Sequence, residues 1–357
     1  SSTLWWILSD LAPWLLRFLV FFALYRWIPT THVKLRAAVI CGIIISSALF
    51  ITKVGKSIVR RQYSGDRIRS RKMRNKSQTD VLERVGKQIS VIELQGPLFF
   101  GSAEHLAANI DKSLENSPTY FILDMKRVNE IDSTGANIIL RVKKKLESLN
   151  KFFLLSNVKQ NSSLWEFLEA MNVTQKLDAN SIFPDTDSAL EWSEDQLLKN
   201  LNNTIEGSKE VPISEIDLLR NLSSTELDIF SKNFVSLKFA KGEKILEEGD
   251  SSRDLYLLKS GSVTVAMNLP EKKCCKRLYT FSPGIVFGEV AFLDGGKRSA
   301  GIWAHENTEV LKYPYKKFQD LQTNRPELAA KLIRNIALEL SHRLRRISNQ
   351  MRLMEDQ

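Results

Sequence analysis

Short apolar runs separated by turn glycines constrain the carboxy-terminal third of this 357-residue chain more than any other feature. Three glycines interrupt the segment 239–267, namely Gly242, Gly249 and Gly261. Between them, Leu255–Leu258 and Val263–Ala266 have the length and composition of strands. Regularly spaced short strands with turn signals indicate an all-β domain, and we expect a small double-sheet jelly roll here.

A second segment, Phe287–Ala300, places one carboxylate and one guanidinium nine residues apart, across a glycine-containing loop. A carboxylate such as Glu289 accepts hydrogen bonds from sugar hydroxyls, and a guanidinium such as Arg298 binds phosphate through two parallel bonds. A helical turn after Gly288 would present backbone N–H groups to the same phosphate. The pattern predicts a site for a cyclic nucleotide, whose ribose hydroxyl and single phosphate charge need both groups.

The joined pattern resembles the phosphate-binding cassette of the cyclic nucleotide-binding domain family, whose fold is a β-roll flanked by helices. The resemblance implies that Glu289 holds the ribose and Arg298 the cyclic phosphate. Ser299 can bond to the phosphate or to a guanine amino group, so cAMP and cGMP both remain candidate ligands. The candidate binding residues are Gly288, Glu289, Val290, Ala291, Arg298, Ser299 and Ala300.

The positive charge of the chain is concentrated near its start. The net charge is +10, and ten Lys or Arg residues but one Asp lie between Lys53 and Lys76. This run follows an apolar stretch, Ala37–Thr52, and a second stretch, Leu4–Tyr25, precedes it across the joint Arg26–Pro29. Basic residues after a membrane segment mark the cytoplasmic side and attract anionic lipid. We expect a short membrane hairpin in the inner membrane with the later domains in the cytoplasm, and no nucleic-acid partner.

Both apolar stretches are short or interrupted for a bilayer, which needs roughly 20 apolar residues. The cysteines, Cys41, Cys274 and Cys275, form neither a metal-binding spacing nor a disulfide framework. The four histidines are scattered through the sequence. We therefore expect no metal cofactor and no enzyme active site in this chain.

The middle of the chain alternates strands with helices, which indicates a compact sheet with helices packed on it. The expected strands are Ile89–Leu94, Tyr120–Asp124 and Phe152–Ser156. The expected helices are Ala103–Glu115, Gly135–Leu149 and Ser163–Met171. This order predicts an α/β domain.

A hydroxyl stands where the second of these helices begins, within Ile131–Gly135. Ser133 at that position can cap the helix, and a phosphate there would be stabilised by the helix dipole. Together with Gly96–Ala103, the region resembles the STAS domain of anti-anti-sigma factors and of the tails of sulfate-permease-type transporters. In the anti-sigma antagonists the residue aligned with Ser133 is phosphorylated, so capping and phosphorylation are both open roles for it.

Residues 43–345 as a whole resemble the carboxy-terminal part of a sulfate-permease (SulP) family transporter with an appended cyclic nucleotide-binding domain. The resemblance rests on Gly42–Phe50, Arg60–Arg67 and Leu94–Ala103. Residues 11–42 are instead similar to the BrkB-type membrane family. Because such transporters have about a dozen spans and this chain offers at most two, we expect a fragment or a fusion, and transport by this chain alone is doubtful.

These observations predict a multidomain protein: a membrane segment at 1–54, a basic juxtamembrane linker at 55–85, an α/β STAS domain at 86–195, a linker at 196–224 and a β-roll domain at 225–357. A long helix from Pro326 to about Met354 ends the chain, with an apolar stripe that includes Leu328, Leu332, Ile336 and Leu344 and a basic end.

We interpret the chain as a membrane-tethered regulatory module of a SulP-type anion transporter that responds to a cyclic nucleotide. Its expected partners are membrane lipid, a transporter core or other membrane subunit, and a second copy of itself. A stand-alone cyclic nucleotide-responsive STAS signalling protein is the alternative. A cyclic nucleotide-dependent transcription factor is a weaker one, because it needs a helix-turn-helix that does not follow before Gln357.

Overall fold

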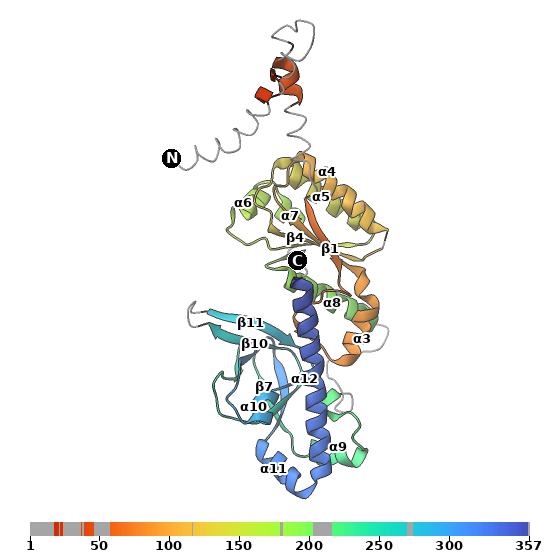
Figure 1. Cartoon of the computed structure of the whole chain (residues 1–357). Coiled ribbons are helices and arrows are strands. Elements are labelled where there is room, and N and C mark those ends of the chain that lie inside the picture. The colour runs from red at the N-terminus through yellow and green to blue at the C-terminus, as the bar shows by residue number, and fades with distance from the viewer. Residues whose placement is uncertain are drawn as a thin grey trace. The chain divides into compact units, whose positions relative to one another are not determined.

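The computed structural model describes residues 18–20, 22–23, 37, 39–45, 58–115, 117–178, 181–202, 216–269 and 274–355. They form two compact units. The first unit contains residues up to Gln62 together with Val91–Asp185, and the second contains Tyr63–Ser90 together with Thr186–Gln357. Each unit is described by itself below (Figure 1).

The first unit is built on one five-stranded sheet with the order β1-β3-β4-β5-β6. These strands are β1 (Val59–Ser64), β3 (Ile89–Gln95), β4 (Tyr120–Arg127), β5 (Phe152–Ser156) and β6 (Ile182–Phe183). The helices are α4 (Phe100–Leu114), α5 (Ser133–Ser148), α6 (Ser163–Ala170) and α7 (Val173–Lys176). The expected α/β arrangement is therefore present.

The parallel strands β4, β5 and β6 form one side of this sheet. The first six residues of β4 are buried, which matches the continuous apolar run of a strand covered on both faces. Helix α5 turns Ala136, Ile139 and Leu146 towards the same core, and all three are fully buried. Their spacing explains why this segment is helical: it collects the apolar side chains on one face.

The second unit contains the predicted β-roll as two sheets. One sheet has the order β2-β11-β10-β13-β8, and the other has the order β12-β9-β14-β7. The strands are β2 (Lys72–Met73), β7 (Val235–Phe239), β8 (Lys244–Leu246), β9 (Leu255–Ser260), β10 (Val263–Leu269), β11 (Cys274–Phe281), β12 (Val286–Phe287), β13 (Gly301–Ala304) and β14 (Thr308–Tyr313). Its helices are α3 (Lys76–Val85), α8 (Thr186–Asn202), α9 (Ser224–Ser231), α10 (Glu289–Asp294), α11 (Tyr315–Asn324) and α12 (Pro326–Glu355).

The segment predicted as a basic linker is instead folded. Within residues 55–85, the structure places β1, β2 and α3. Strand β2 pairs in parallel with β11, where Lys72 lies opposite Thr280 and Met73 opposite Phe281. The interpretation of the whole segment as a linker is therefore wrong, because β2 extends the edge of a β-roll sheet.

The second predicted linker begins inside a helix. The linker was predicted at 196–224, but α8 continues to Asn202, and the helix buries Ser193 and Glu194 just before the predicted boundary. Glu194 accepts hydrogen bonds from the backbone nitrogen of Ser70 at 2.9 Å and from its hydroxyl at 2.6 Å. It also pairs with Arg74 at 2.8 Å. Glu194 thus joins α8 to the residues on both sides of β2, and apolar periodicity gives no sign of such a buried pair.

Helix α12 begins with Pro326, a favoured residue at a first helical position. Leu328, Leu332 and Ile336 of the predicted stripe are buried in the core beside α11. Farther along the stripe, Leu344 is 65 % exposed. The stripe therefore serves as packing against the β-roll over the first half of the helix.

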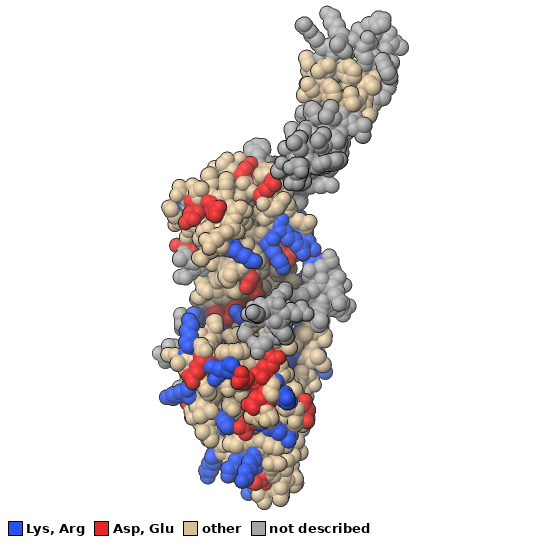
Figure 2. All heavy atoms as spheres, turned by 90° about the vertical axis from the view of Figure 1, so that its left-hand side faces the viewer, with Lys and Arg blue, Asp and Glu red and all other residues tan. Residues whose placement is uncertain are grey.

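The predicted membrane hairpin lies largely outside the described residues. Arg26–Pro29, most of Leu4–Tyr25 and half of Ala37–Thr52 belong to that undescribed part. In the described residues, no helix has the length and apolar composition that crossing a bilayer requires. On the face of the second unit visible in Figure 2, basic and acidic side chains are interspersed, so the excess positive charge does not form one patch on that face.

Candidate functional site

The predicted site is formed where β12 ends and α10 begins. Gly288 joins the two elements with φ +79°, in the left-handed region that favours glycine. A Cβ atom at this position would lie 2.6 Å from Nη1 of Arg298. Glycine is thus required for two reasons: the backbone turn and the close approach of the guanidinium.

Arg298 is buried, with 3 % of its surface exposed, and its hydrogen bonds go to uncharged oxygens. Nη1 donates to the Gly288 carbonyl at 2.8 Å, and Nη2 donates to the Asp254 carbonyl at 2.7 Å. Nε donates to the Ser252 hydroxyl at 3.2 Å. Among the described residues no carboxylate lies within ion-pair distance of this guanidinium, and burial lowers its pKa. A buried cation held only by neutral groups is suited to bind an anion.

Glu289, the first residue of α10, is 9 % exposed and pairs with Arg343 of α12. Arg343 Nη1 donates to Glu289 Oε1 at 2.9 Å. The same guanidinium donates to Glu339 at 2.8 Å and to the Val286 carbonyl. Burial alone lowers the pKa of Arg343, but the charges of Glu289 and Glu339 raise it on balance. The carboxylate predicted to hold a ribose is therefore occupied by a side chain of the last helix.

Aromatic rings lie beside both charged residues. Tyr256 and Phe287 stack with centroids 5.4 Å apart. The guanidinium of Arg298 lies 5.8 Å from the Tyr256 ring, and that of Arg343 lies 5.2 Å from the Phe281 ring. These rings exclude water from one side of each cation, which strengthens its electrostatic interactions.

The structure brings Gly288, Glu289 and Arg298 together, as the sequence predicted, through the contacts described above. Of the other predicted site residues, Ala291 is buried and Ala300 packs beside the core. Val290 and Ser299 are exposed.

Sequence reasoning missed Arg343, which it counted only as part of the basic end of the last helix. It also missed the Asp254 carbonyl and the Ser252 hydroxyl. Arg343 is 54 positions from Glu289, so only the fold brings the two together.

The predicted cap at Ser133 is wrong. The N-cap of α5 is Asp132, whose carboxylate accepts a hydrogen bond from the Gly135 nitrogen at 2.7 Å. Ser133 is the first helical residue and is exposed. An Asp side chain reaches back to the first-turn N–H groups from the N-cap position, so the serine hydroxyl is not needed there.

No cluster of three or more His, Cys, Asp or Glu residues in the described ranges has the arrangement of a metal site. Cys41 is half-buried and free. The side chains of Cys274 and Cys275 lie outside the described part.

Two stretches of the chain match known domain families. Residues 236–325 match the cyclic nucleotide-binding domain, and this stretch contains Glu289 and Arg298. Residues 79–189 match the STAS domain, which includes the sheet strands β3 to β6.

Three proteins of different kinds are similar to parts of this chain. Glutaminase 2 of Bradyrhizobium diazoefficiens is 28 % identical over 277 residues, which cover 78 % of this chain and 43 % of the relative. A vacuolar basic amino acid transporter of Saccharomyces cerevisiae is 30 % identical over 183 residues, or 48 % of this chain and 17 % of the transporter. The cyclic AMP receptor protein of Thermus thermophilus is 31 % identical over 138 residues, or 38 % of this chain and 61 % of the receptor.

The chain spans less than half the length of the glutaminase that it matches. The match nevertheless extends over more residues than either domain alone. This chain contains a STAS domain followed by a cyclic nucleotide-binding domain.

Proposed function

We propose that this chain is a regulatory module that binds a cyclic nucleotide, cAMP or cGMP, between Glu289 and Arg298. The observation that carries the proposal is the buried guanidinium of Arg298, which bonds only to neutral oxygens in the described structure. The cyclic phosphate would supply the missing negative charge. Glu289 would accept a hydrogen bond from the ribose 2′-hydroxyl.

Occupancy of the site would be transmitted through α12. A ribose hydroxyl that approaches Glu289 competes with Arg343, which holds the same carboxylate at 2.9 Å. A ligand shifts a conformational equilibrium when it interacts better with one of the two states. The nucleotide therefore favours the state in which Arg343 has left Glu289 and α12 has moved.

Movement of α12 would also reach β2. One turn beyond Arg343, Arg346 donates hydrogen bonds to the carbonyls of Ser70 at 3.2 Å and Lys72 at 3.1 Å. Ser70 is bonded in turn to Glu194 of α8. This chain of contacts gives the nucleotide site a physical route to α8, whose first residues lie within the stretch matched to the STAS domain.

The activity under control belongs, in our proposal, to another part of a longer polypeptide or to a membrane partner. One candidate is an anion transporter of the SulP type, with the chain tethered to the inner membrane and its domains in the cytoplasm. It is supported by the sequence resemblance of Gly42–Phe50 and Leu94–Ala103 and by the basic run after the apolar stretch. If this candidate is correct, the chain would associate with a second copy of itself, with membrane lipid and with a transporter core.

A glutaminase is the second candidate. Its support is the length of the match to Glutaminase 2, which covers 78 % of this chain and therefore includes more than one domain. On this proposal the module would control an enzyme activity that the chain itself does not contain. The coding sequence on either side of these 357 residues distinguishes the two candidates, since one predicts many apolar spans and the other a catalytic domain.

Calorimetric titration of the chain with cAMP and with cGMP tests the binding proposal. We expect saturable binding of at least one nucleotide, and loss of that binding in Arg298→Leu. The matched control is Lys297→Leu, which removes an exposed charge from the neighbouring position. Failure of the wild-type chain to bind either nucleotide would reject the proposed function.

Membrane tethering requires a separate test. After cell lysis and high-speed centrifugation, we expect the full chain to pellet with membranes. We expect a variant that begins at Val59 to remain in the supernatant. A full chain found in the supernatant would contradict tethering without affecting the nucleotide site.

A further inference from the structure

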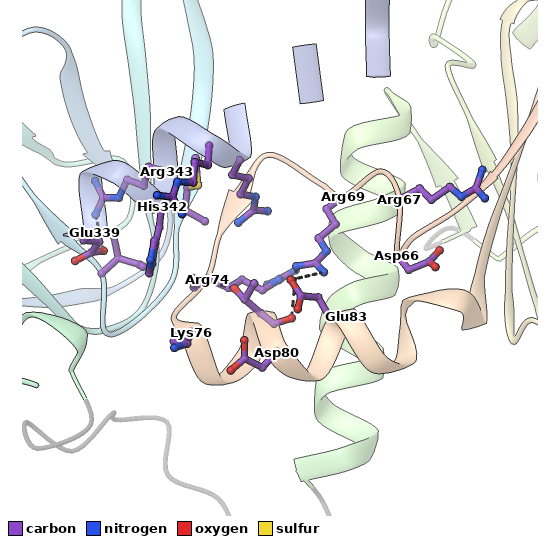
Figure 3. A pocket seen from close by; sticks show the side chains of 15 residues that line it. Asp66, Arg67, Arg69, Arg74, Lys76, Asp80, Glu83, Glu339, His342 and Arg343 are labelled. Carbon is purple, nitrogen blue, oxygen red and sulfur yellow. Dashed lines mark hydrogen bonds and ion pairs between the residues drawn. The ribbon is translucent and has the colours of Figure 1, made fainter. Parts of the chain in front are cut away.

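A cavity in the second unit is lined mainly by charged residues. Its volume is about 430 Å³. It lies among the segment 66–83, helix α12 and Ile285, which is the last residue of the loop between β11 and β12. Figure 3 shows its side chains coming from α12 on one side and from the segment containing α3 on the other. Neither Glu289 nor Arg298 lines it, so it is distinct from the proposed nucleotide site.

The lining carries an excess of positive charge. Seven Arg or Lys side chains line the cavity, against four carboxylates. Two of those carboxylates are already paired with lining arginines, Glu83 with Arg69 at 3.4 Å and Glu339 with Arg343 at 2.8 Å. A third lining cation, Arg74, pairs with Glu194 and Asp195, which do not line the cavity, both at 2.8 Å. The other charged lining residues are Arg67, Lys76, Arg345 and Arg346 against Asp66 and Asp80, so an excess of positive charge remains.

The guanidinium of Arg346 is the focus of this excess. It bonds to the carbonyls of Ser70 and Lys72, and no carboxylate of the described residues lies within ion-pair distance. Burial lowers its pKa, and the nearby charges of Arg69 and Arg74 lower it further against the attraction of Glu194. Arg69 and Arg74 each have a carboxylate partner, whereas Arg346 has none within ion-pair distance among the described residues. An anion in the cavity would therefore supply the counter-charge of Arg346 and of the lining cations beside it.

We infer that this cavity binds a small anion with two or more phosphate charges. Guanidinium groups match phosphate oxygens through paired hydrogen bonds, which favours phosphate over a monocarboxylate. The volume is within the range of small-molecule sites, about 300–1,000 Å³. An anion bound there would lie beside Arg343, the residue that holds Glu289, so the site is placed to influence the nucleotide-binding carboxylate.

Titration with inorganic pyrophosphate at constant ionic strength tests the inference directly. We expect saturable binding to the wild-type chain in the absence of any cyclic nucleotide. Removing one charge-assisted hydrogen bond weakens binding by about ten- to a hundredfold, so Arg346→Gln and Arg345→Gln should each fall in that range. Arg345 is exposed and has no hydrogen bond in the described structure, so its replacement leaves the fold intact even if Arg346→Gln does not.

Arg334→Gln is the matched control. Arg334 is an exposed arginine of the same helix that does not line the cavity. We expect its affinity for pyrophosphate to stay within about twofold of wild type, because a charge outside the cavity acts only through screened solvent. No saturable binding to wild type, or an equal loss in Arg334→Gln, would overturn the site.

Competition with vesicles identifies the source of the anion. Cardiolipin vesicles, whose headgroup carries two phosphates, that displace pyrophosphate when phosphatidylcholine vesicles do not would assign the cavity to a lipid headgroup. Retention of pyrophosphate in both would assign it to a soluble phosphate compound. Because binding is measured without cyclic nucleotide, its outcome does not depend on the proposed function of Glu289 and Arg298.

Discussion

Arg343 of the last helix forms an ion pair with Glu289 at 2.9 Å and so holds the carboxylate that we propose binds a ribose. The two side chains are 14 % and 11 % exposed. Such a pair is screened less by salt than a surface pair is. The contact connects the state of the nucleotide site to the position of α12.

Replacement of Arg343 should therefore have opposite effects on stability and on affinity. In Arg343→Met, Glu289 keeps its burial but loses its counter-ion, so the melting temperature without ligand should fall. Nucleotide affinity should rise by at least about fivefold, the lower end of typical coupling between linked equilibria. Calorimetry and a thermal melt measure both effects, with Arg334→Met as the control. An affinity that falls along with the melting temperature would show that Arg343 supports the site and does not compete for it.

Gly288 provides a test of the contact between the turn and Arg298. Any side chain at a positive φ costs about 1–3 kcal/mol, and Gly288→Ala also places a methyl group 2.6 Å from Arg298 Nη1. Gly242→Ala is a matched control, because Gly242 has φ +84° and no atom near its missing Cβ. Both variants should lose stability in urea denaturation, but only Gly288→Ala should lose nucleotide binding. Equal nucleotide affinities in the two variants would contradict the assigned geometry.

At the start of α5, Asp132 caps the helix, and the neighbouring Ser133 is a candidate modification site. Asp132→Ala removes the cap and should lower the free energy of unfolding by about 1 kcal/mol. Ser133→Ala removes no hydrogen bond to the helix and should leave stability nearly unchanged. A phosphate on the exposed Ser133 would meet the positive end of the helix dipole, so we expect Ser133→Asp to fold normally.

Phosphorylation of Ser133 remains a prediction that mass spectrometry of the protein from its native cells can check. A destabilised Ser133→Ala variant beside a stable Asp132→Ala variant would reverse the assignment of the cap.

The buried Tyr313 should make the stability of the fold decrease at alkaline pH. Its ring is fully buried and stacks on Phe230 at 4.3 Å, and its hydroxyl has no hydrogen-bond partner among the described residues. Burial raises the pKa of Tyr313 to about 12. Because the folded-state pKa is above the ordinary value of 10, the native state is favoured fully below pH 10. That advantage is lost as the pH rises from 10 towards 12.

Tyr313→Phe removes both the unpaired hydroxyl and the ionisation. We expect it to raise the free energy of unfolding by about 1 kcal/mol at pH 8, and the gain over wild type to grow above pH 10. Urea denaturation at pH 8 and pH 11 measures the difference. A gain that is the same at both values would show that Tyr313 does not titrate in this range.

The parts of the fold that the sequence predicted are those with a strong local pattern. Tyr120–Leu123 is a continuous apolar run at the start of β4, and the glycine-separated runs at Leu255 and Val263 begin β9 and β10. The proximity of Gly288 and Glu289 to Arg298 was also predictable, because the three lie within eleven consecutive residues. Their chemistry is local in the sequence.

The parts that the sequence did not predict depend on pairs of residues far apart in the chain. Strand β2 has two residues, and it exists because β11 offers it a free edge. Helix α8 has a weak apolar pattern, and the buried pair of Glu194 with Arg74 joins residues 120 positions apart. In the sequence, Arg343 belongs to a basic helix end of the kind that usually faces solvent. In the fold, it lies against Glu289. Such contacts leave no periodicity in the sequence.

The central claim is that a cyclic nucleotide binds through the buried charge of Arg298. The most direct measurement is calorimetric titration of the wild-type chain and of Arg298→Leu with cAMP and cGMP, with Lys297→Leu as the control. We predict saturable binding to wild type and to Lys297→Leu, and a loss of about 3 kcal/mol or more in Arg298→Leu, because the phosphate then has no buried cation as its partner. Unchanged affinity in Arg298→Leu would contradict this account.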